Sequence, residues 1–142
     1  MGSTEMNSII IDTHVFLWLM EGSSELQPSE IELINKIVNN GQVLIASISI
    51  WEIAMLQKLG KITLSTPIKD WVEQSLNQKG IVIVTFDVAI LIESVFLPGN
   101  FHKDPADRMI VATSRIKKVP LLTRDRRILD YSKDGHLQVV EL

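Results

Sequence analysis

The chain has 142 residues, of which 46% are hydrophobic and 22% charged, and a net charge of −3, as expected of an ordinary globular domain. It contains no cysteine, which excludes disulfides, thiolate metal ligands and cysteine nucleophiles. No apolar run is long enough to span a bilayer and no signal peptide is recognisable. We therefore expect a single cytoplasmic domain over residues 1–142 with no membrane partner. Residues 1–5 are a candidate vector-derived or disordered segment, with Met6 as the natural start.

Short apolar runs alternate with longer segments of helical periodicity, which predicts βαβ units and a parallel sheet. In chain order the predicted elements are a strand at 8–11, helices at 13–20 and 28–39, a strand at 43–47, helices at 49–59 and 67–78, a strand at 81–84, helices at 87–96 and 105–117, and strands at 121–123 and 137–140. The strands are rich in Val, Ile and Leu without alternation, which indicates burial on both faces. The pattern predicts an α/β fold with a doubly wound sheet.

Four acidic residues come shortly after predicted strands or at the start of a helix. They are Asp12, Glu52, Asp107 and Asp125. Parallel strands deliver the residues that follow them to one carboxyl edge, where open α/β sheets bind ligands. Carboxylates gathered at that edge repel one another unless some are protonated or a hard divalent cation neutralises them. The arrangement predicts a metal site.

Each acid, taken alone, also has a simpler interpretation. Residues 49–52 have the sequence of a capping box, in which Glu52 would bond back to the N-cap amide. Asp104 and Asp107 fit the N-cap and third positions of the next helix, and Asp125 fits a turn. Asp12 is harder to explain, because a carboxylate that ends a buried strand is costly unless it is paired or metal-bound. We favour the metal site because capping gives no reason for every strand exit to be acidic.

Several neighbouring residues were assigned supporting or structural roles. His14 and His102 are interpreted as solvent-facing or hydrogen-bonded imidazoles, since Mg²⁺ and Mn²⁺ prefer oxygen ligands. Thr13 and Thr123 flank two of the acids, where they either hydrogen-bond the carboxylates or serve as ordinary strand-end residues. The predicted core includes Trp18, Trp51, Trp71, Met109, Ile110 and Ala112.

The chain resembles the PIN-domain nucleases, specifically the VapC-like toxins of bacterial toxin-antitoxin pairs. Four stretches carry the resemblance: IIIDTHVFLWL at 9–19, SISIWEIAMLQKLGKI at 47–62, FHKDPADRMIVATS at 101–114 and LLTRD at 121–125. Each motif is loose alone, but the four together occur in the order and spacing of the family. The resemblance implies a PIN-like three-layer α/β/α fold with a mostly parallel five-stranded sheet.

The resemblance also implies roles for individual residues. Asp12, Glu52, Asp107 and Asp125 match the family's acids in order, and Asp104 matches an additional acid of the HxDPxDR subgroup. The better-known toxins carry Asn-x-x-Asp after the Thr-Arg pair, whereas Asp125 and Ile128 stand at those positions here, which leaves open whether one or two metals bind. The implied activity is that of a Mg²⁺- or Mn²⁺-dependent endoribonuclease that is a homodimer and is silenced by a cognate antitoxin.

The basic residues are concentrated in one region. Residues 101–127 hold eight Lys and Arg against three acids, a net +5, whereas the remainder has a net charge of −8. Either this region is a solvated basic face or it attracts an RNA backbone past the acidic cleft. The candidate RNA contacts are Arg108, Lys117, Lys118, Arg124 and Arg126.

Three other functions are alternatives to a toxin ribonuclease. A phosphoacceptor receiver domain would need a pair of acids after the first strand and a lysine after the last core strand, but Asp12 stands alone and Arg124 follows Thr123. A structure-specific DNA or RNA nuclease outside a toxin pair would differ in substrate. A non-catalytic RNA- or protein-binding PIN module would show no metal-dependent cleavage.

Overall fold

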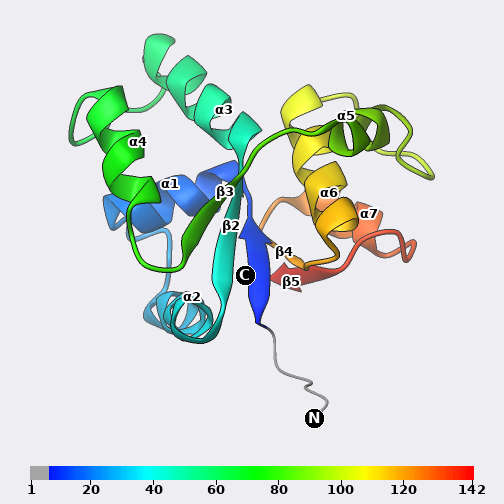
Figure 1. Cartoon of the computed structure of the whole chain (residues 1–142), viewed down its shortest axis with the longest axis horizontal. Coiled ribbons are helices and arrows are strands. Elements are labelled where there is room, and N and C mark those ends of the chain that lie inside the picture. Colours follow the sequence, from blue (N-terminus) through cyan, green and yellow to red (C-terminus); the bar gives the residue numbers. More distant parts are fainter. Residues whose placement is uncertain (1–6) are drawn as a thin grey trace.

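Five short apolar segments form a single parallel sheet in the computed structural model, which describes residues 7–142 (Figure 1). The strands are β1 Ser8–Ile11, β2 Gln42–Ala46, β3 Ile81–Val84, β4 Leu121–Thr123 and β5 Val139–Glu141. Their order in the sheet is β3-β2-β1-β4-β5, and every neighbouring pair is parallel. The candidate segment at residues 1–5 and Met6 lie outside the described residues.

Seven helices surround this sheet in the part of the chain that the structure describes. They are α1 Thr13–Glu21, α2 Pro28–Asn40, α3 Ser47–Lys58, α4 Ile68–Leu76, α5 Val88–Val95, α6 Pro105–Lys117 and α7 Arg126–Ser132. Within residues 7–142 no helix combines the length and apolarity needed to cross a membrane.

The alternation of side chains along β1 divides the core into two halves. Ile9 and Ile11 pack into one apolar cluster with α1, α2 and α4, while Ile10 packs into the other with α5, α6 and α7. Helix α3 contributes to both clusters, through Ile53 on one face and Ile48 on the other. The chain therefore has the three-layer α/β/α architecture. The central strands β1, β2 and β4 are buried on both faces as their composition predicts, whereas the edge strands β3 and β5 are only partly buried.

The strand order explains why a site lies at the end of β1. Ile11, the last residue of β1, is paired with Ile45 of β2 on one side and with Leu122 of β4 on the other. The chain leaves β1 for β2 and β3 and later returns to the other side of β1, which makes β1 a topological switch point. The residues after β1, β2 and β4 therefore meet at one edge.

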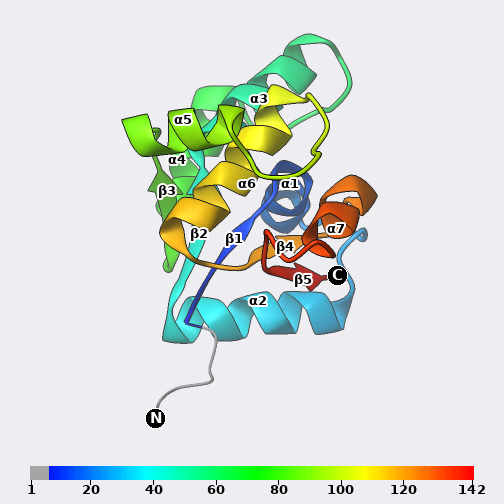
Figure 2. The ribbon, with the colours of Figure 1, turned by 90° about the vertical axis from the view of Figure 1, so that its right-hand side faces the viewer.

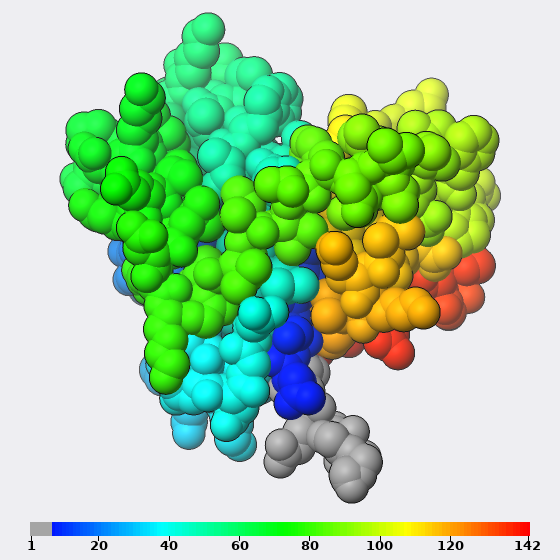
Figure 3. Space-filling model, viewed as in Figure 1, coloured from blue at the N-terminus to red at the C-terminus, as the bar shows by residue number. Residues whose placement is uncertain are grey.

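Two views locate the helices around this edge. In Figures 1 and 2, α3 and the first turn of α6 lie at the end of the sheet where β1 ends, whereas α2 and the last turn of α6 lie toward the opposite end. In the space-filling view of Figure 3, α3 and α4 stand apart from α5 and α6, with a notch between them. Helix α6 thus presents its N-terminus, and not its C-terminus, to the candidate site.

The start of α3 differs from the prediction and changes the interpretation of Glu52. Strand β2 ends at Ala46 and α3 begins at Ser47, so residue 47 is helical and the predicted capping box is wrong. The buried Ser49 hydroxyl is instead 2.9 Å from the Thr13 hydroxyl, with which it shares a hydrogen bond. Glu52 consequently lies in the second turn of α3, beyond the reach of the N-cap. The capping box that is present joins Gln27 and Glu30 at the start of α2.

The last two elements were also misjudged. Helix α7 was not predicted, because its seven residues are too few to show a clear periodicity. Strand β5 begins at Val139, where its pairing with Leu121 of β4 begins, and not at residue 137; the side chain of Leu137 is buried in the second apolar cluster. The other boundaries agree with the prediction to within two residues.

Candidate active site

A pocket of about 290 Å³ opens at the carboxyl edge of the sheet. The predicted acids all line it, together with aromatic and basic side chains: Asp12, Thr13, His14, Val15, Trp18, Glu52, Asp104, Asp107, Arg124, Asp125 and Arg127. Residues separated by more than a hundred positions are thereby gathered at the ends of β1 and β4 and at the starts of α3 and α6.

Asp12 is held in place from two directions. It is the N-cap of α1 and accepts a hydrogen bond from the backbone N–H of Val15 at 3.0 Å. The hydroxyl of Thr123 donates to its other carboxylate oxygen. Only 8% of Asp12 is exposed, and this burial raises the pKa of its carboxyl group despite both hydrogen bonds. Asp12 is therefore a fixed carboxylate at the floor of the pocket.

Thr123 connects Asp12 to Asp125. The Thr123 hydroxyl, which donates to Asp12, also accepts the backbone N–H of Asp125 at 2.9 Å. Asp125 is the N-cap of α7, where it accepts N–H groups of Arg127 at 2.8 Å and Ile128 at 3.3 Å. The turn interpretation of Asp125 is thus replaced by a helix cap. Thr123 has the supporting role proposed for it, but Thr13 contacts Ser49 and no carboxylate.

Asp104 and Asp107 occupy the first turn of α6, as the sequence predicts. Asp104 caps the helix by accepting the N–H groups of Ala106 at 2.9 Å and Asp107 at 3.2 Å. The Asp107 side chain points into the pocket and is 14% exposed. Burial and the nearby charges of Asp104, Asp125 and Glu52 raise the pKa of Asp107 to about 7. Burial is the largest cause of this shift; the neighbouring carboxylates add to it, and the positive charge of Arg127 offsets only part of their effect.

His102 supports Asp107 from the loop before α6. Its Nδ1 accepts the backbone N–H of Asp104 at 3.3 Å, which leaves the ring proton on Nε2, and Nε2 lies 3.0 Å from Asp107 Oδ2. Burial and the charge of Arg127 lower the pKa of His102, which favours its neutral form. This hydrogen-bonded imidazole agrees with the prediction. His14 lies at the pocket rim and is exposed to solvent.

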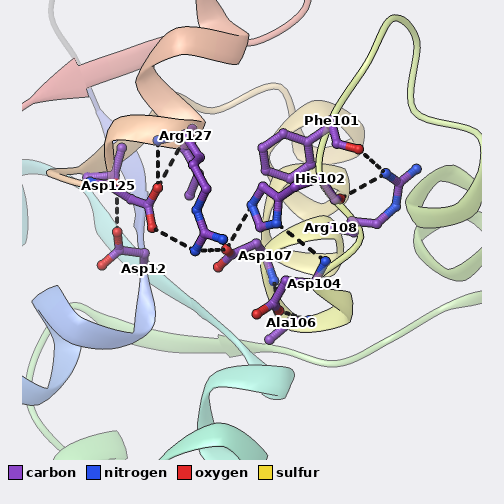
Figure 4. Close-up of polar contacts among 11 residues, drawn as sticks. Asp12, Phe101, His102, Asp104, Ala106, Asp107, Arg108, Asp125 and Arg127 are labelled. Carbon is purple, nitrogen blue, oxygen red and sulfur yellow. Dashed lines mark hydrogen bonds and ion pairs between the residues drawn. The ribbon is translucent and has the colours of Figure 1, made fainter.

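The acids have the ligand chemistry that a divalent cation needs, although their side chains are not arranged around a single ion position. Carboxylate oxygens are the ligands that Mg²⁺ and Mn²⁺ prefer, and the charges of Asp104, Asp125 and Glu52 add to the effect of burial in raising the pKa of Asp107. Yet in the part of the chain that the structure describes, no three acidic or histidine side chains are arranged to hold one ion. Figure 4 shows the guanidinium group of Arg127 between Asp107 and Asp125.

Two of the predicted RNA contacts, Arg108 and Arg124, are engaged within the protein. The Arg108 guanidinium donates to backbone carbonyls of the α5 end and of the loop before α6: Ser94, Val95, Phe101 and His102. Arg124 is paired with Glu30 at 3.0 Å, and its guanidinium carbon lies 5.0 Å from the Trp18 ring centre. Both arginines tie loops to the pocket and have little freedom to contact a ligand.

The remaining predicted contacts are divided between the two ends of the molecule. Lys117 and Lys118 close α6 at the end opposite to Asp104, about 20 Å away at the rise of an α-helix. The structure therefore does not bring them to the pocket. Arg126 is exposed and lies on the first turn of α7, next to the pocket.

Arg127 is a pocket residue that the sequence does not single out, and the prediction that Trp51 belongs to the core is wrong. Trp71 is 3% exposed and belongs to the core, and Trp18 packs against the first apolar cluster while it also lines the pocket, but Trp51 is 56% exposed. Trp51 lies on the solvent side of α3. Its spacing fits a helix and so predicts a core position, but helical spacing alone does not show which face of the helix is buried. Arg127 was indistinguishable from Arg126 until the start of α7 was known.

Comparison with known proteins agrees with this geometry. The PIN domain family matches residues 9–134, which include all the acids of the pocket. Ribonuclease VapC22 of Mycobacterium tuberculosis is 33% identical over 123 residues, which are 87% of this chain and 91% of that protein. Among solved structures, VapBC2 of Rickettsia felis bound to a promoter DNA fragment gives a TM-score of 0.70 at 13% identity, covering 95% of this chain and 98% of that one.

A second solved structure, FitAcB of Neisseria gonorrhoeae, gives a TM-score of 0.61 at 16% identity over 94% of this chain and 96% of that chain. Identities this low show a shared fold, whereas the family match and the relative at 33% identity extend to the sequence. The chain belongs to the PIN-domain family.

Proposed function

We propose that this protein is a Mg²⁺- or Mn²⁺-dependent endoribonuclease and the toxin of a toxin-antitoxin pair. The observation that carries the proposal is the convergence of Asp12, Glu52, Asp107 and Asp125 from four separate elements into one pocket. The family match and the similarity to a protein named as a VapC ribonuclease support RNA as the substrate.

Asp12, Glu52 and Asp107 would hold the cation, and Asp125 would contribute a further ligand or orient water. Asp104 is an additional candidate, although its carboxylate is already engaged in capping α6. When bound, the cation supplies positive charge that polarises the scissile phosphate and makes water a better nucleophile. The chain offers no cysteine, so water rather than a thiol performs the attack in this proposal.

The side chains of the pocket also prepare its geometry. Backbone N–H groups of α1 and α7 fix one oxygen of Asp12 and one of Asp125, so these carboxylates need no reorganisation when a ligand arrives. His102 orients Asp107 from the side of the α6 loop. Single-stranded or looped RNA is the proposed substrate, because an unpaired backbone can enter a pocket of this size.

Two exposed apolar surfaces support protein partners. On α5 the side chains of Val88, Leu91, Ile92 and Val95 recur at helical spacing and are 42% to 71% exposed. We propose this stripe as the contact between two copies of the chain, since one surface packed on itself forms a two-fold dimer. Ile92→Glu should shift the mass measured by sedimentation from dimer to monomer, while a dimer that persists would reject this surface.

A second surface supports the antitoxin. Trp51, Met55 and Leu59 are exposed along α3, the helix that places Glu52 in the pocket. An antitoxin segment docked there would reach the acids within one or two helical turns, and an arginine from it would pair with the carboxylates. Trp51→Ala should weaken antitoxin binding in a pull-down while leaving RNA cleavage by the free toxin intact.

The direct test of the function is RNA cleavage by purified protein. Cleavage of unstructured RNA should require Mg²⁺ or Mn²⁺, stop in chelator and be lost in Asp12→Asn. Induction in a bacterial host should arrest growth for the wild type but not for Asp12→Asn at equal protein level. Cleavage in chelator would reject the metal, preferential cutting of structured DNA would favour a nuclease outside a toxin pair, and absence of any cleavage would favour a binding module.

A further inference from the structure

Arg127 is the basic side chain that reaches the acids of the pocket most directly. Its Nη2 lies 3.5 Å from Asp107 Oδ2 and 3.7 Å from Asp125 Oδ2, as Figure 4 shows. Its own backbone N–H is anchored on Asp125 Oδ1 at 2.8 Å, at the start of α7. The residue is therefore fixed at the pocket rim while its guanidinium group bridges two candidate ligands.

Two other arginines of this region, Arg108 and Arg124, are engaged elsewhere. Arg124 pairs with Glu30, and Arg108 donates to four backbone carbonyls. The Arg127 side chain, in contrast, is 61% exposed, and both of its contacts are longer than an ordinary charged hydrogen bond. Exposed pairs of this kind contribute about 0–1 kcal/mol, so the guanidinium group is easily displaced.

A divalent cation would compete with Arg127 for the same oxygens. A cation bound to Asp107 and Asp125 places positive charge beside the guanidinium group and removes the negative charge that attracted it. The displaced side chain remains attached to α7 at the mouth of the pocket. A guanidinium group matches a phosphate bidentately, so the substrate backbone becomes its best available partner.

We propose that Arg127 alternates between two partners: the Asp107 and Asp125 carboxylates before metal binds, and an RNA phosphate beside the scissile bond afterwards. Arg127 is thus both a competitor of the metal and a substrate-positioning residue. The inference rests on the proposed nuclease function, and its first half concerns the protein without RNA.

The first half is tested by titrating Mn²⁺ into the full-length chain by calorimetry, without RNA. Arg127→Gln should bind Mn²⁺ about threefold to fivefold more tightly than the wild type, because a weak competitor has been removed. Arg126→Gln is the matched control: it removes the same charge from the adjacent residue, which is exposed and lies outside the pocket lining. If both variants gained Mn²⁺ affinity equally, the effect would be one of net charge and would contradict a specific role of Arg127. If Arg127→Gln gained no affinity, Arg127 would not compete with the metal.

The second half is tested at saturating Mn²⁺ with an unstructured RNA. Arg127→Gln should raise KM about tenfold with a smaller change in kcat, and should reduce the salt dependence of KM by about one phosphate contact. Arg127→Lys should recover part of the loss, since it keeps the charge but not the bidentate geometry. An unchanged KM would overturn the positioning role.

The two measurements also separate this inference from the proposed function. A wild-type chain that binds Mn²⁺ but cuts no RNA would reject the ribonuclease and the positioning role, while the titration would still decide the competition. A wild-type chain that binds no Mn²⁺ would overturn both the proposed cofactor and the competition.

Discussion

The acidic pocket has two sides that are built differently. On the side of α1 and α7, Asp12 and Asp125 are N-caps whose oxygens accept backbone N–H groups. On the side of α3 and α6, Glu52 projects from the second turn of a helix and Asp107 from the first, and neither is an N-cap. Capping and ligand binding, which compete as explanations in the sequence, are compatible in the structure, because each carboxylate oxygen has two lone pairs and can accept a hydrogen bond while it also binds a cation.

This difference predicts which substitutions affect activity alone and which also affect stability. A capping aspartate replaced by asparagine keeps its helix cap, since asparagine is an equally good N-cap residue. A projecting acid does not cap a helix, and in the absence of metal its negative charge lowers the stability of the fold by repelling the other carboxylates. Both sides should nevertheless be equally necessary for catalysis.

The largest expected effect is the loss of activity when either side loses one charge. Asp12→Asn and Asp107→Asn should each lower kcat/KM for RNA cleavage at least about 100-fold, because each removes a ligand for a hard cation. Both variants should remain folded, as circular dichroism would show. If one variant kept near wild-type activity while the other lost it, the two sides would not form one catalytic site.

Glu52→Gln tests whether an acid on the α3 and α6 side of the pocket affects activity without affecting stability. Activity should fall about 10- to 100-fold, since an amide is a poorer ligand than a carboxylate. The free energy of unfolding should change by less than about 0.5 kcal/mol, because Glu52 lies beyond the α3 cap. A denaturation midpoint lowered by the substitution, with turnover preserved, would return Glu52 to a structural role.

A pH titration of stability sharpens the comparison at Asp107. Its carboxyl group, with a pKa of about 7 in the metal-free fold, binds its proton more tightly there than in the unfolded chain. Its contribution to stability is therefore full below about pH 3.8, the ordinary pKa of the group, and is lost as the pH rises through 7. We expect the wild type to lose about 1–2 kcal/mol over this range relative to Asp107→Asn, after allowance for solvent screening. Parallel stability curves for the two proteins would contradict the raised pKa.

The smallest effect concerns the cap at Asp125. Asp125→Ala should lower the free energy of unfolding by about 1 kcal/mol, whereas Asp125→Asn should be nearly neutral. Chemical denaturation of the two variants measures the difference directly. Equal stability of the alanine and asparagine variants would mean that the α7 cap contributes little and that the two sides of the pocket do not differ in this respect.

The sheet and the four acids could be predicted from the sequence because strands buried on both faces leave unbroken apolar runs. The carboxyl edge then follows from the parallel order, and Asp12 is the natural first acid of such an edge. The start of α3 could not be predicted in this way. Ser49 and Glu52 have capping-box spacing, but tertiary contact with Thr13 determines where the Ser49 hydroxyl points.

The basic residues show a further limit of sequence reasoning. Composition locates a basic region but not the direction in which each side chain points. Lys117 and Lys118 lie at the end of α6 that is far from the pocket, and the Arg108 guanidinium group donates its hydrogen bonds to backbone carbonyls. Arg127 reaches the acids only because Asp125 begins the short helix α7, an element with too few residues to be recognised by its periodicity.

The most direct test of the account is whether both sides of the pocket bind one cation. Calorimetric titration of Mn²⁺ should give a single strong binding event for the wild type, weakened at least about tenfold both in Asp12→Asn and in Asp107→Asn, with the fold retained. A titration in which either variant binds Mn²⁺ as tightly as the wild type would show that its side of the pocket is not part of the metal site, and would contradict the central claim.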